Sequence, residues 1–439
     1  MLGCLEWETG SVDGGGSPLS EQEVRPPGDP GFLEYLEDVW DKIDREELVG
    51  FVRDLVGIPS VFRPDDPEGN EARAACYVAD YLEGEGFEVR VEEVSPGRPN
   101  VWALWSGSRP GKTLLFEGHT DVVTEGRAEE WAYPPFGAEV LGNRIYGRGS
   151  CDTKGNLAAA VMAVKAIKDS GVPFAGRLLL CHPVDEEGMM LGIKHFIRQG
   201  HAEGVDGAVI CEPEENQLCV AQKGAMRVEV TVHGEMAHGA MPLSGVNPVT
   251  RAARFIVAVE ELEREEISRH GEDPLLGYPS ITPTIMLGPP EGGEPQINVI
   301  PSSAYVALDL RTVPAQSHAE IIARLESCIE VLKTEDPDFE AELQVIEERP
   351  PTETEGEDPL VRAMAAAYTQ LVGKPPRYNG VPGATDGTFL RAWAGIPIVT
   401  TGAGDRTIPH HKDEWVDVDE LLTTCRLYAA TAMYFCYAE

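Results

Sequence analysis

Short apolar runs alternate with helix-forming segments along the first half of the chain, and this alternation restricts the possible folds most strongly. Strand-like runs are predicted at 88–94, 101–105, 113–117, 178–181 and 207–211, and helices at 32–56, 71–85, 155–170 and 191–199. Parallel strands need a crossover connection, usually a helix, so this order favours an α/β sheet with helices packed on it.

The pattern changes near Gln222. Residues 226–234 alternate between apolar and polar side chains, as expected for a strand with one face in water. A helix at 248–269, strands at 281–288 and 303–313, and a helix at 318–333 follow. This β-α-β-β-α order indicates a small α+β sandwich inserted into the larger α/β domain. The predicted division is a disordered tail at 1–30, the larger domain at 31–221 and 336–439, and the inserted domain at 222–335.

Composition excludes several partners. The chain has 439 residues, enough for more than one domain, and a formal net charge of −38, which argues against nucleic acid or an anionic membrane as partner. The sequence shows no span long and apolar enough for a bilayer and no signal peptide at its start. Its nine cysteines are scattered, with no CxxC pair, which favours reduced thiols and a cytoplasmic location.

Acidic and imidazole side chains directly follow several predicted strands, where α/β folds usually place their sites. They are His119 and Asp121 after 113–117, Asp152 in a glycine-rich turn before 155–170, Glu186 and Glu187 after 178–181, Glu212 after 207–211, and His410 and His411 near the C-terminus. Each alone fits an ordinary role, such as a packed histidine, a helix N-cap or a solvated acidic loop. Together, imidazole and carboxylate donors suit a divalent transition-metal site.

The spacing of these residues suggests individual roles. Asp121 can accept the second ring N–H of His119 and fix its tautomer. Asp152, on a rigid turn, can bridge two ions about 3.5–4 Å apart. Adjacent residues on extended backbone point in different directions. One of Glu186 and Glu187 can therefore bind a metal while the other serves as general base.

The motifs GHTDVV, YGRGSCDTKG, DEEG, CEP, HGEMAHGAMPLSGVNPV and HHKDEWV occur in an order that resembles the M20 metallopeptidases and deacylases. That group includes acetylornithine deacetylases, succinyl-diaminopimelate desuccinylases, aminoacylase-1 and glutamate carboxypeptidases. The resemblance covers about residues 45–437. It implies a zinc-peptidase-like catalytic domain, with a central mixed sheet and flanking helices, and a ferredoxin-like inserted domain that acts as lid and dimerisation module.

The resemblance also implies roles for the candidate residues. It places His119 and Glu212 on one metal ion, Glu187 and His410 on a second, and Asp152 between them, with Glu186 as general base and Asp121 as the supporting carboxylate. In the family the last ligand stands four residues before an acidic residue. His410 stands four residues before Glu414, which favours it over His411.

On the substrate side, the resemblance implies that His238 reaches across a dimer to polarise the scissile carbonyl, an oxyanion-type role. Asn298 and Arg311 match positions that hold the substrate or its carboxylate, which a guanidinium group can bind through two hydrogen bonds. Gly383 and Asp386, in GATDGTF, are weaker candidates. An ordinary turn histidine and a surface ion pair are the alternatives for His238 and Arg311.

The expected function is hydrolysis of an amide bond in N-acyl amino acids, with a metal-bound water as nucleophile and Glu186 as base. The expected cofactors are two divalent metal ions, with Zn²⁺ first and Co²⁺ or Mn²⁺ as alternatives, and the expected assembly is a homodimer. A dipeptidase or carboxypeptidase of the same family and a catalytically silent binding protein stay as alternatives. The segment QKG at 222–224 differs from the basic signatures of several members, so the sequence selects no single named activity.

Overall fold

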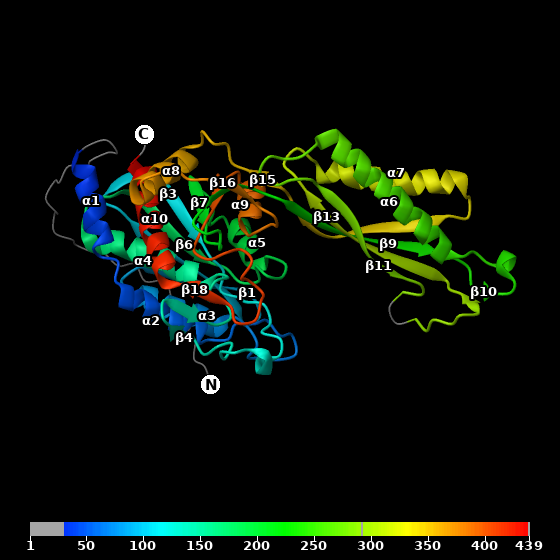
Figure 1. The fold of residues 1–439 in the computed structure, drawn as a ribbon, viewed down its shortest axis with the longest axis horizontal. Coiled ribbons are helices and arrows are strands. Elements are labelled where there is room, and N and C mark those ends of the chain that lie inside the picture. Colours follow the sequence, from blue (N-terminus) through cyan, green and yellow to red (C-terminus); the bar gives the residue numbers. More distant parts are fainter. Residues whose placement is uncertain (1–29, 291–292, 438–439) are drawn as a thin grey trace.

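The computed structural model describes residues 30–290 and 293–437, so the predicted tail lies outside the described residues except for Pro30. Figure 1 shows two units side by side, a larger one that contains the first and last helices and a smaller one built from the middle of the chain. Each unit is organised around one sheet.

The larger unit contains a nine-stranded sheet in the order β1-β2-β6-β3-β7-β17-β8-β15, with β16 also paired to β8. The strands are β1 (Glu88–Ser95), β2 (Arg98–Ser106), β3 (Arg109–Glu117), β6 (Ala175–His182), β7 (Gly207–Ile210), β8 (Leu218–Gln222), β15 (Thr352–Glu353), β16 (Tyr378–Val381) and β17 (Ile398–Thr400). β3 runs parallel to β6 and β7, whereas β2 is antiparallel to β6. The predicted α/β fold with a central mixed sheet is confirmed.

Helices cover both faces of this sheet. Those on one face are α1 (Pro30–Trp40), α2 (Arg45–Val56), α3 (Ala72–Gly84), α4 (Lys154–Ser170), α8 (Pro359–Val372) and α10 (Val418–Tyr437), and those on the other are α5 (Leu191–Arg198) and α9 (Gly387–Ala394). Leu114 and Phe116 of β3 belong to the first core, and Leu115 between them belongs to the second. The strand is buried on both sides, which explains its continuous apolar sequence.

The single helix predicted at 32–56 is wrong, because the chain forms two helices there. α1 ends at Trp40 and α2 begins at Arg45. Asp44 adopts an extended conformation, and its carboxylate accepts a hydrogen bond from the backbone N–H of Glu47 at 2.8 Å. This N-cap starts a new helix although the apolar spacing runs on without interruption.

The smaller unit contains an antiparallel sheet in the order β11-β13-β9-β14. Its strands are β9 (Gly224–His233), β11 (Ser280–Leu287), β13 (Ser303–Thr312) and β14 (Glu340–Arg349), and α6 (Pro248–His270) and α7 (His318–Glu335) cover one face (Figure 1). The boundary predicted after residue 335 therefore falls inside this sheet. β14 lies beyond it, and only one of its ten residues is buried, so it lacks the apolar run of a core strand.

Shorter elements complete the fold. They are η1 (Ala128–Glu130), β4 (Glu139–Leu141), β5 (Arg144–Tyr146), β10 (Ala237–His238), η2 (Pro242–Ser244), β12 (Val299–Ile300) and β18 (Trp415–Asp417). The chain passes between the two units twice, from β8 to β9 and from β14 to β15, and the two passages are adjacent because Gln222 pairs with Thr352 and Ala225 with Arg349. Among the described helices, none has the length and apolar character needed to cross a membrane.

Candidate metal centre

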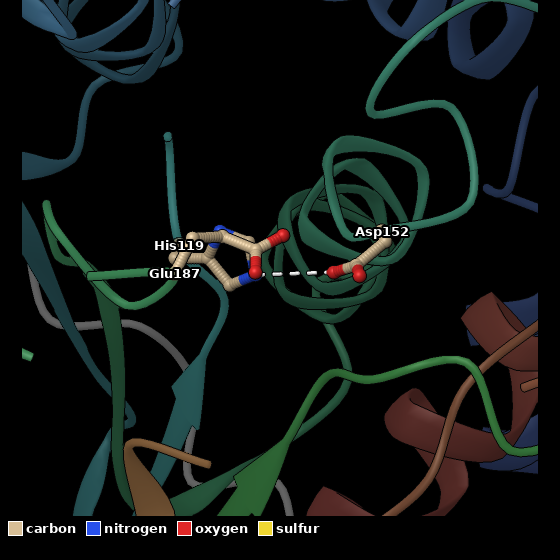
Figure 2. A group of neighbouring side chains, drawn as sticks. All are labelled: His119, Asp152 and Glu187. Carbon is tan, nitrogen blue, oxygen red and sulfur yellow. Dashed lines mark hydrogen bonds and ion pairs between the residues drawn. The ribbon is translucent and has the colours of Figure 1, made fainter. Parts of the chain in front are cut away.

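Three loops carry most of the candidate residues to one edge of the main sheet. His119 and Asp121 follow β3, Glu186 and Glu187 follow β6, and Glu212 follows β7. Since β3 is parallel to both other strands, the three loops leave the sheet at the same edge. Asp152 joins them from the turn before α4 (Figure 2), and His410 joins them from the loop before β18.

His119 is fully buried at the centre of this group. Its Nδ1 lies 3.0 Å from the backbone oxygen of Asp121 and 3.5 Å from the Oδ1 atom of the same residue. Its Nε2 lies 3.2 Å from Asp152 Oδ1 (Figure 2), 3.5 Å from Glu212 Oε1 and 3.9 Å from Glu186 Oε2. One ring nitrogen is therefore held by the Asp121 loop, and the other faces three carboxylates.

Asp121 also fixes the loop that follows β6. Its Oδ1 accepts a hydrogen bond from the backbone N–H of Glu186 at 3.1 Å, and its Oδ2 accepts one from the backbone N–H of Glu187 at 3.0 Å. The carboxylate thus connects the loop after β3 to the loop after β6, a function that the sequence pattern did not predict.

Asp152 lies between two groups of donors. Its Oδ1 faces His119, and its Oδ2 lies 3.4 Å from Nε2 of His410. The same His410 nitrogen lies 3.0 Å from Glu187 Oε1. His410 and the neighbouring His411 are both exposed, and the contacts with Asp152 and Glu187 are made by His410. One carboxylate therefore separates the pair His119 and Glu212 from the pair His410 and Glu187.

The electrostatics of the group follow from burial and close charges. Burial raises the pKa of Glu212 to about 8 and raises that of Glu186 well above its usual range. Hydrogen bonds to Asp152 and Glu187 raise the pKa of His410 to about 10. Burial opposes the charged form of His119, but the facing carboxylates outweigh it and raise its pKa. In the protein alone, the clustered carboxylates favour the protonated form of both imidazoles.

The donor set fits divalent metal ions. His119, Asp152 and Glu187 each offer a ligand atom, and these atoms lie within 4.8 Å of one another (Figure 2). Oε1 of Glu212 is buried and accepts no hydrogen bond from the described part of the chain. Imidazole nitrogen and carboxylate oxygen are common ligands of zinc and related ions. Bound divalent cations would offset the negative charge of the clustered carboxylates.

A scaffold beneath Asp152 was not predicted from the sequence. Glu414 Oε1 accepts hydrogen bonds from the backbone N–H groups of Gly149, Cys151 and Asp152 at 3.0, 3.0 and 3.1 Å. Its other oxygen pairs with the buried guanidinium group of Arg148 at 2.5 Å. In the sequence, Glu414 marks the position of His410, and the arginine within YGRGS is the one signal of a buried partner for it.

The predicted substrate residues lie elsewhere. His238 and Asn298 are neighbours, because His238 pairs with Val299 and the Gly239 N–H donates to the Asn298 oxygen at 2.7 Å. Both are exposed, and β10 lies at the end of the smaller unit remote from the larger one (Figure 1). Within one chain, the structure does not bring them to the metal centre.

Arg311 and the loop containing Gly383 lie near the passages between the units. Arg311 occupies β13, and its Nε donates to Asp309 Oδ1 at 2.8 Å, so it makes the surface ion pair considered above. The loop of Gly383 is tied to the end of β8 by Thr385, whose hydroxyl donates to Gln222 Oε1 at 2.8 Å. Asp386 in the same loop is fully buried.

Comparison with known proteins shows matches along most of the chain. A sequence profile of Peptidase family M20/M25/M40 matches residues 115–434. The succinyl-diaminopimelate desuccinylase of Gluconobacter oxydans (strain 621H) is 31% identical over 396 residues, which cover 87% of this chain and 96% of that protein.

Two solved structures have the same fold. The M20 family metallo-carboxypeptidase Sso-CP2 from Sulfolobus solfataricus gives a TM-score of 0.73 at 20% identity, over 89% of this chain and 100% of that one. The YXEP protein of Bacillus subtilis, a dinuclear metal-binding peptidase, gives 0.66 at 16% identity, over 89% and 98% of the two chains.

Proposed function

The chain belongs to peptidase family M20/M25/M40, and we propose that it is a dinuclear-metal hydrolase of the amide bond in N-acyl amino acids. Family membership makes it a metal-dependent hydrolase. The observation that carries the finer proposal is the position of Asp152, with one oxygen toward His119 and the other toward His410. The similarity to a desuccinylase supports an acyl amino acid as substrate.

The two metal ions would be held on either side of Asp152. His119 and Glu212 would bind one ion, and Glu187 and His410 would bind the other. When bound, divalent ions polarise the scissile carbonyl and lower the pKa of water to about 7. The mixture of imidazole and carboxylate donors supports Zn²⁺, with Co²⁺ or Mn²⁺ as alternatives.

Glu186 acts as general base in this proposal. Glu187 and Glu186 diverge as their adjacency suggested, because Glu187 contacts His410 while Glu186 Oε2 faces His119 at 3.9 Å. A carboxylate held beside the ligands takes a proton from the attacking water and delivers it to the leaving nitrogen. Water attacks directly, so no acyl-enzyme forms. Asp121 keeps His119 and the two glutamates in position.

The proposed enzyme is a homodimer. His238 and Asn298 are remote from the metal centre of their own chain, and exposed apolar side chains lie close to them along the sequence, including Leu243 at 101% exposure and Ile297 at 107%. Apolar groups gathered at a surface mark contact sites. We propose that this end of one protomer reaches the metal centre of its partner, where His238 stabilises the developing oxyanion. Asn298 and Arg311 would then hold the substrate or its carboxylate, and Gly383 is a weaker candidate for substrate contact.

A peptidase is the second candidate, because the structural neighbour Sso-CP2 is a metallo-carboxypeptidase. Assays of the metal-loaded protein on acetyl- and succinyl-amino acids and on dipeptides separate the two. We expect faster turnover of the acyl amino acids. Faster turnover of dipeptides would make the protein a peptidase, and no turnover of either class by fully metal-loaded protein would contradict the proposed substrates.

The location proposed for this activity is the cytoplasm. The eight cysteines of the described residues are all free thiols, which suits a reducing compartment.

A further inference from the structure

The turn at 185–188, here called the DEEG turn, carries both the proposed base and one proposed ligand, and several contacts hold it. Asp121 accepts the backbone N–H groups of Glu186 and Glu187, as described above. At the start of the turn, Asp185 Oδ1 accepts a hydrogen bond from Arg98 Nη2 at 2.7 Å. All of these contacts come from the larger unit.

Another contact comes from the smaller unit. Arg349 is the last residue of β14, and its Nη2 donates to the backbone oxygen of Gly188 at 2.5 Å. Gly188 directly follows the proposed ligand Glu187. This hydrogen bond joins residues 161 positions apart and links the smaller sheet to the turn that carries the proposed base and ligand.

The Arg349 guanidinium group is itself fixed in place. Its Nε donates to Glu347 Oε1 at 2.5 Å, and the other Glu347 oxygen lies 2.6 Å from Nη1 of Arg227 on β9. The side chains of Glu347 and Arg349 are only 3% and 13% exposed, so water competes little for these contacts. A hydrogen bond from a charged donor is stronger than a neutral one, especially away from water.

The DEEG turn has little room to adjust on its own. A methyl group at Gly188 would lie 2.7 Å from the Asp185 carboxylate, so the turn is packed closely around its own first side chain. A rotation of the peptide unit at Gly188 therefore shifts the backbone of Glu187. Glu187 and Glu186 would then lose their alignment with His410 and His119.

We propose that Arg349 is a positioning residue, which holds the DEEG turn so that Glu186 and Glu187 face the metal centre. The smaller unit thereby contributes to the geometry of the hydrolytic site of its own chain through its strand β14. This inference rests on the proposed function for the roles of the two glutamates.

The test compares Arg349→Met with Arg227→Met in the full-length protein. Both substitutions remove an ion pair with Glu347, but only Arg349 reaches the DEEG turn. We expect Arg349→Met to lower kcat by about 10- to 100-fold, since small misplacements of reacting groups have effects of this size. KM should stay within about twofold, because this contact does not touch the substrate. Arg227→Met leaves the Arg349–Gly188 hydrogen bond in place, so its loss of kcat should be at least about fivefold smaller than that of Arg349→Met.

Two further measurements separate positioning from general stability. The visible spectrum of the cobalt-loaded protein should change in Arg349→Met and not in Arg227→Met, because Glu187 would be a ligand. Amide exchange at 185–190 in the metal-free protein should be faster in Arg349→Met alone. Equal kcat and equal cobalt spectra in the two variants would overturn the proposal.

Arg349→Lys keeps the positive charge and N–H donors but loses the planar guanidinium group, and it replaces Arg349→Met if that variant does not fold. We expect a smaller loss of kcat from the lysine variant than from methionine, and a fully active lysine variant with an unchanged cobalt spectrum would contradict the role of the guanidinium fork. If the unsubstituted protein turns over none of the proposed substrates, the proposed function fails. The cobalt spectrum and amide exchange then still decide the role of Arg349.

Discussion

Replacing Asp121 by asparagine should weaken metal binding and also destabilise the metal-free fold. Both carboxylate oxygens of Asp121 are in use, because Oδ1 accepts the Glu186 N–H at 3.1 Å and Oδ2 accepts the Glu187 N–H at 3.0 Å. Asparagine has one acceptor oxygen, so one of these N–H groups would face an amide donor. A buried donor left without an acceptor costs about 1–3 kcal/mol.

The same substitution removes a negative charge from beside His119, whose Nδ1 lies 3.5 Å from Asp121 Oδ1. Loss of a carboxylate that supports a ligand histidine weakens metal affinity by about 10- to 100-fold. The size expected here lies in that range, equal to about 1.4–2.8 kcal/mol. Competition with a chromophoric zinc chelator measures it directly, and a thermal melt of the metal-free protein reports the effect on the fold.

Asp273→Asn is the matched control for this experiment. Oδ1 of Asp273 also accepts two backbone N–H groups, those of Leu275 and Leu276, both at 2.9 Å. Asparagine keeps that single acceptor oxygen, and Asp273 is not among the candidate metal-site residues. Zinc affinity of Asp121→Asn within about twofold of the control would refute the supporting role of Asp121.

Four further outcomes are expected. Glu186→Gln should lower kcat by about 10²- to 10⁴-fold, with two metal ions per chain still found by elemental analysis; substantial activity would exclude Glu186 as the base. Chelation should abolish activity and lower Tm, and zinc should restore both, because an ion at about 100 times its Kd stabilises the folded state by about 2.7 kcal/mol. In the metal-free protein, the contacts that raise the pKa of His410 stabilise the folded state. Their contribution is complete at pH values below about 6.5, the pKa of histidine in the unfolded chain, and it disappears as the pH rises toward about 10. The stability difference between the metal-free protein and its His410→Gln variant should therefore shrink over that interval in urea titrations, and a difference independent of pH would contradict the ion pair. Mixing Glu186→Gln and His238→Ala chains under subunit exchange should restore activity that each lacks alone, and no restoration would argue against a site shared between protomers.

The fold was predictable where single elements carry their own periodic pattern. The apolar run in β3 and the alanine-rich α4 were located to within a few residues, because both segments are buried and their residues are mostly apolar. The break at Asp44 needed recognition of a cap, and β14 needed recognition of a strand with a single buried residue. Strands of two to four residues, such as β15 and β18, are too short to show any period.

The candidate site divides in a similar way. Residues that follow a strand directly, such as His119 and Glu212, could be located from the sequence, because strand ends in one sheet lie together. The residues that hold these side chains in place could not be located from the sequence. The Arg148–Glu414 pair joins residues 266 positions apart, and Arg349 reaches Gly188 from another sheet. Only the folded topology brings such partners together.

The two passages between the units are adjacent, so the smaller unit is an insertion that could be exchanged for another domain. Gln222 and Thr352 pair across β8 and β15, so the main sheet is already continuous without the residues between them. Strands paired in this way can be joined by a turn of about two residues. The middle of the chain can therefore change in length and surface without altering the register of the strands that carry the metal centre. A replacement unit would need to supply a cation where Arg349 meets Gly188, besides the contacts proposed for His238 and Arg311.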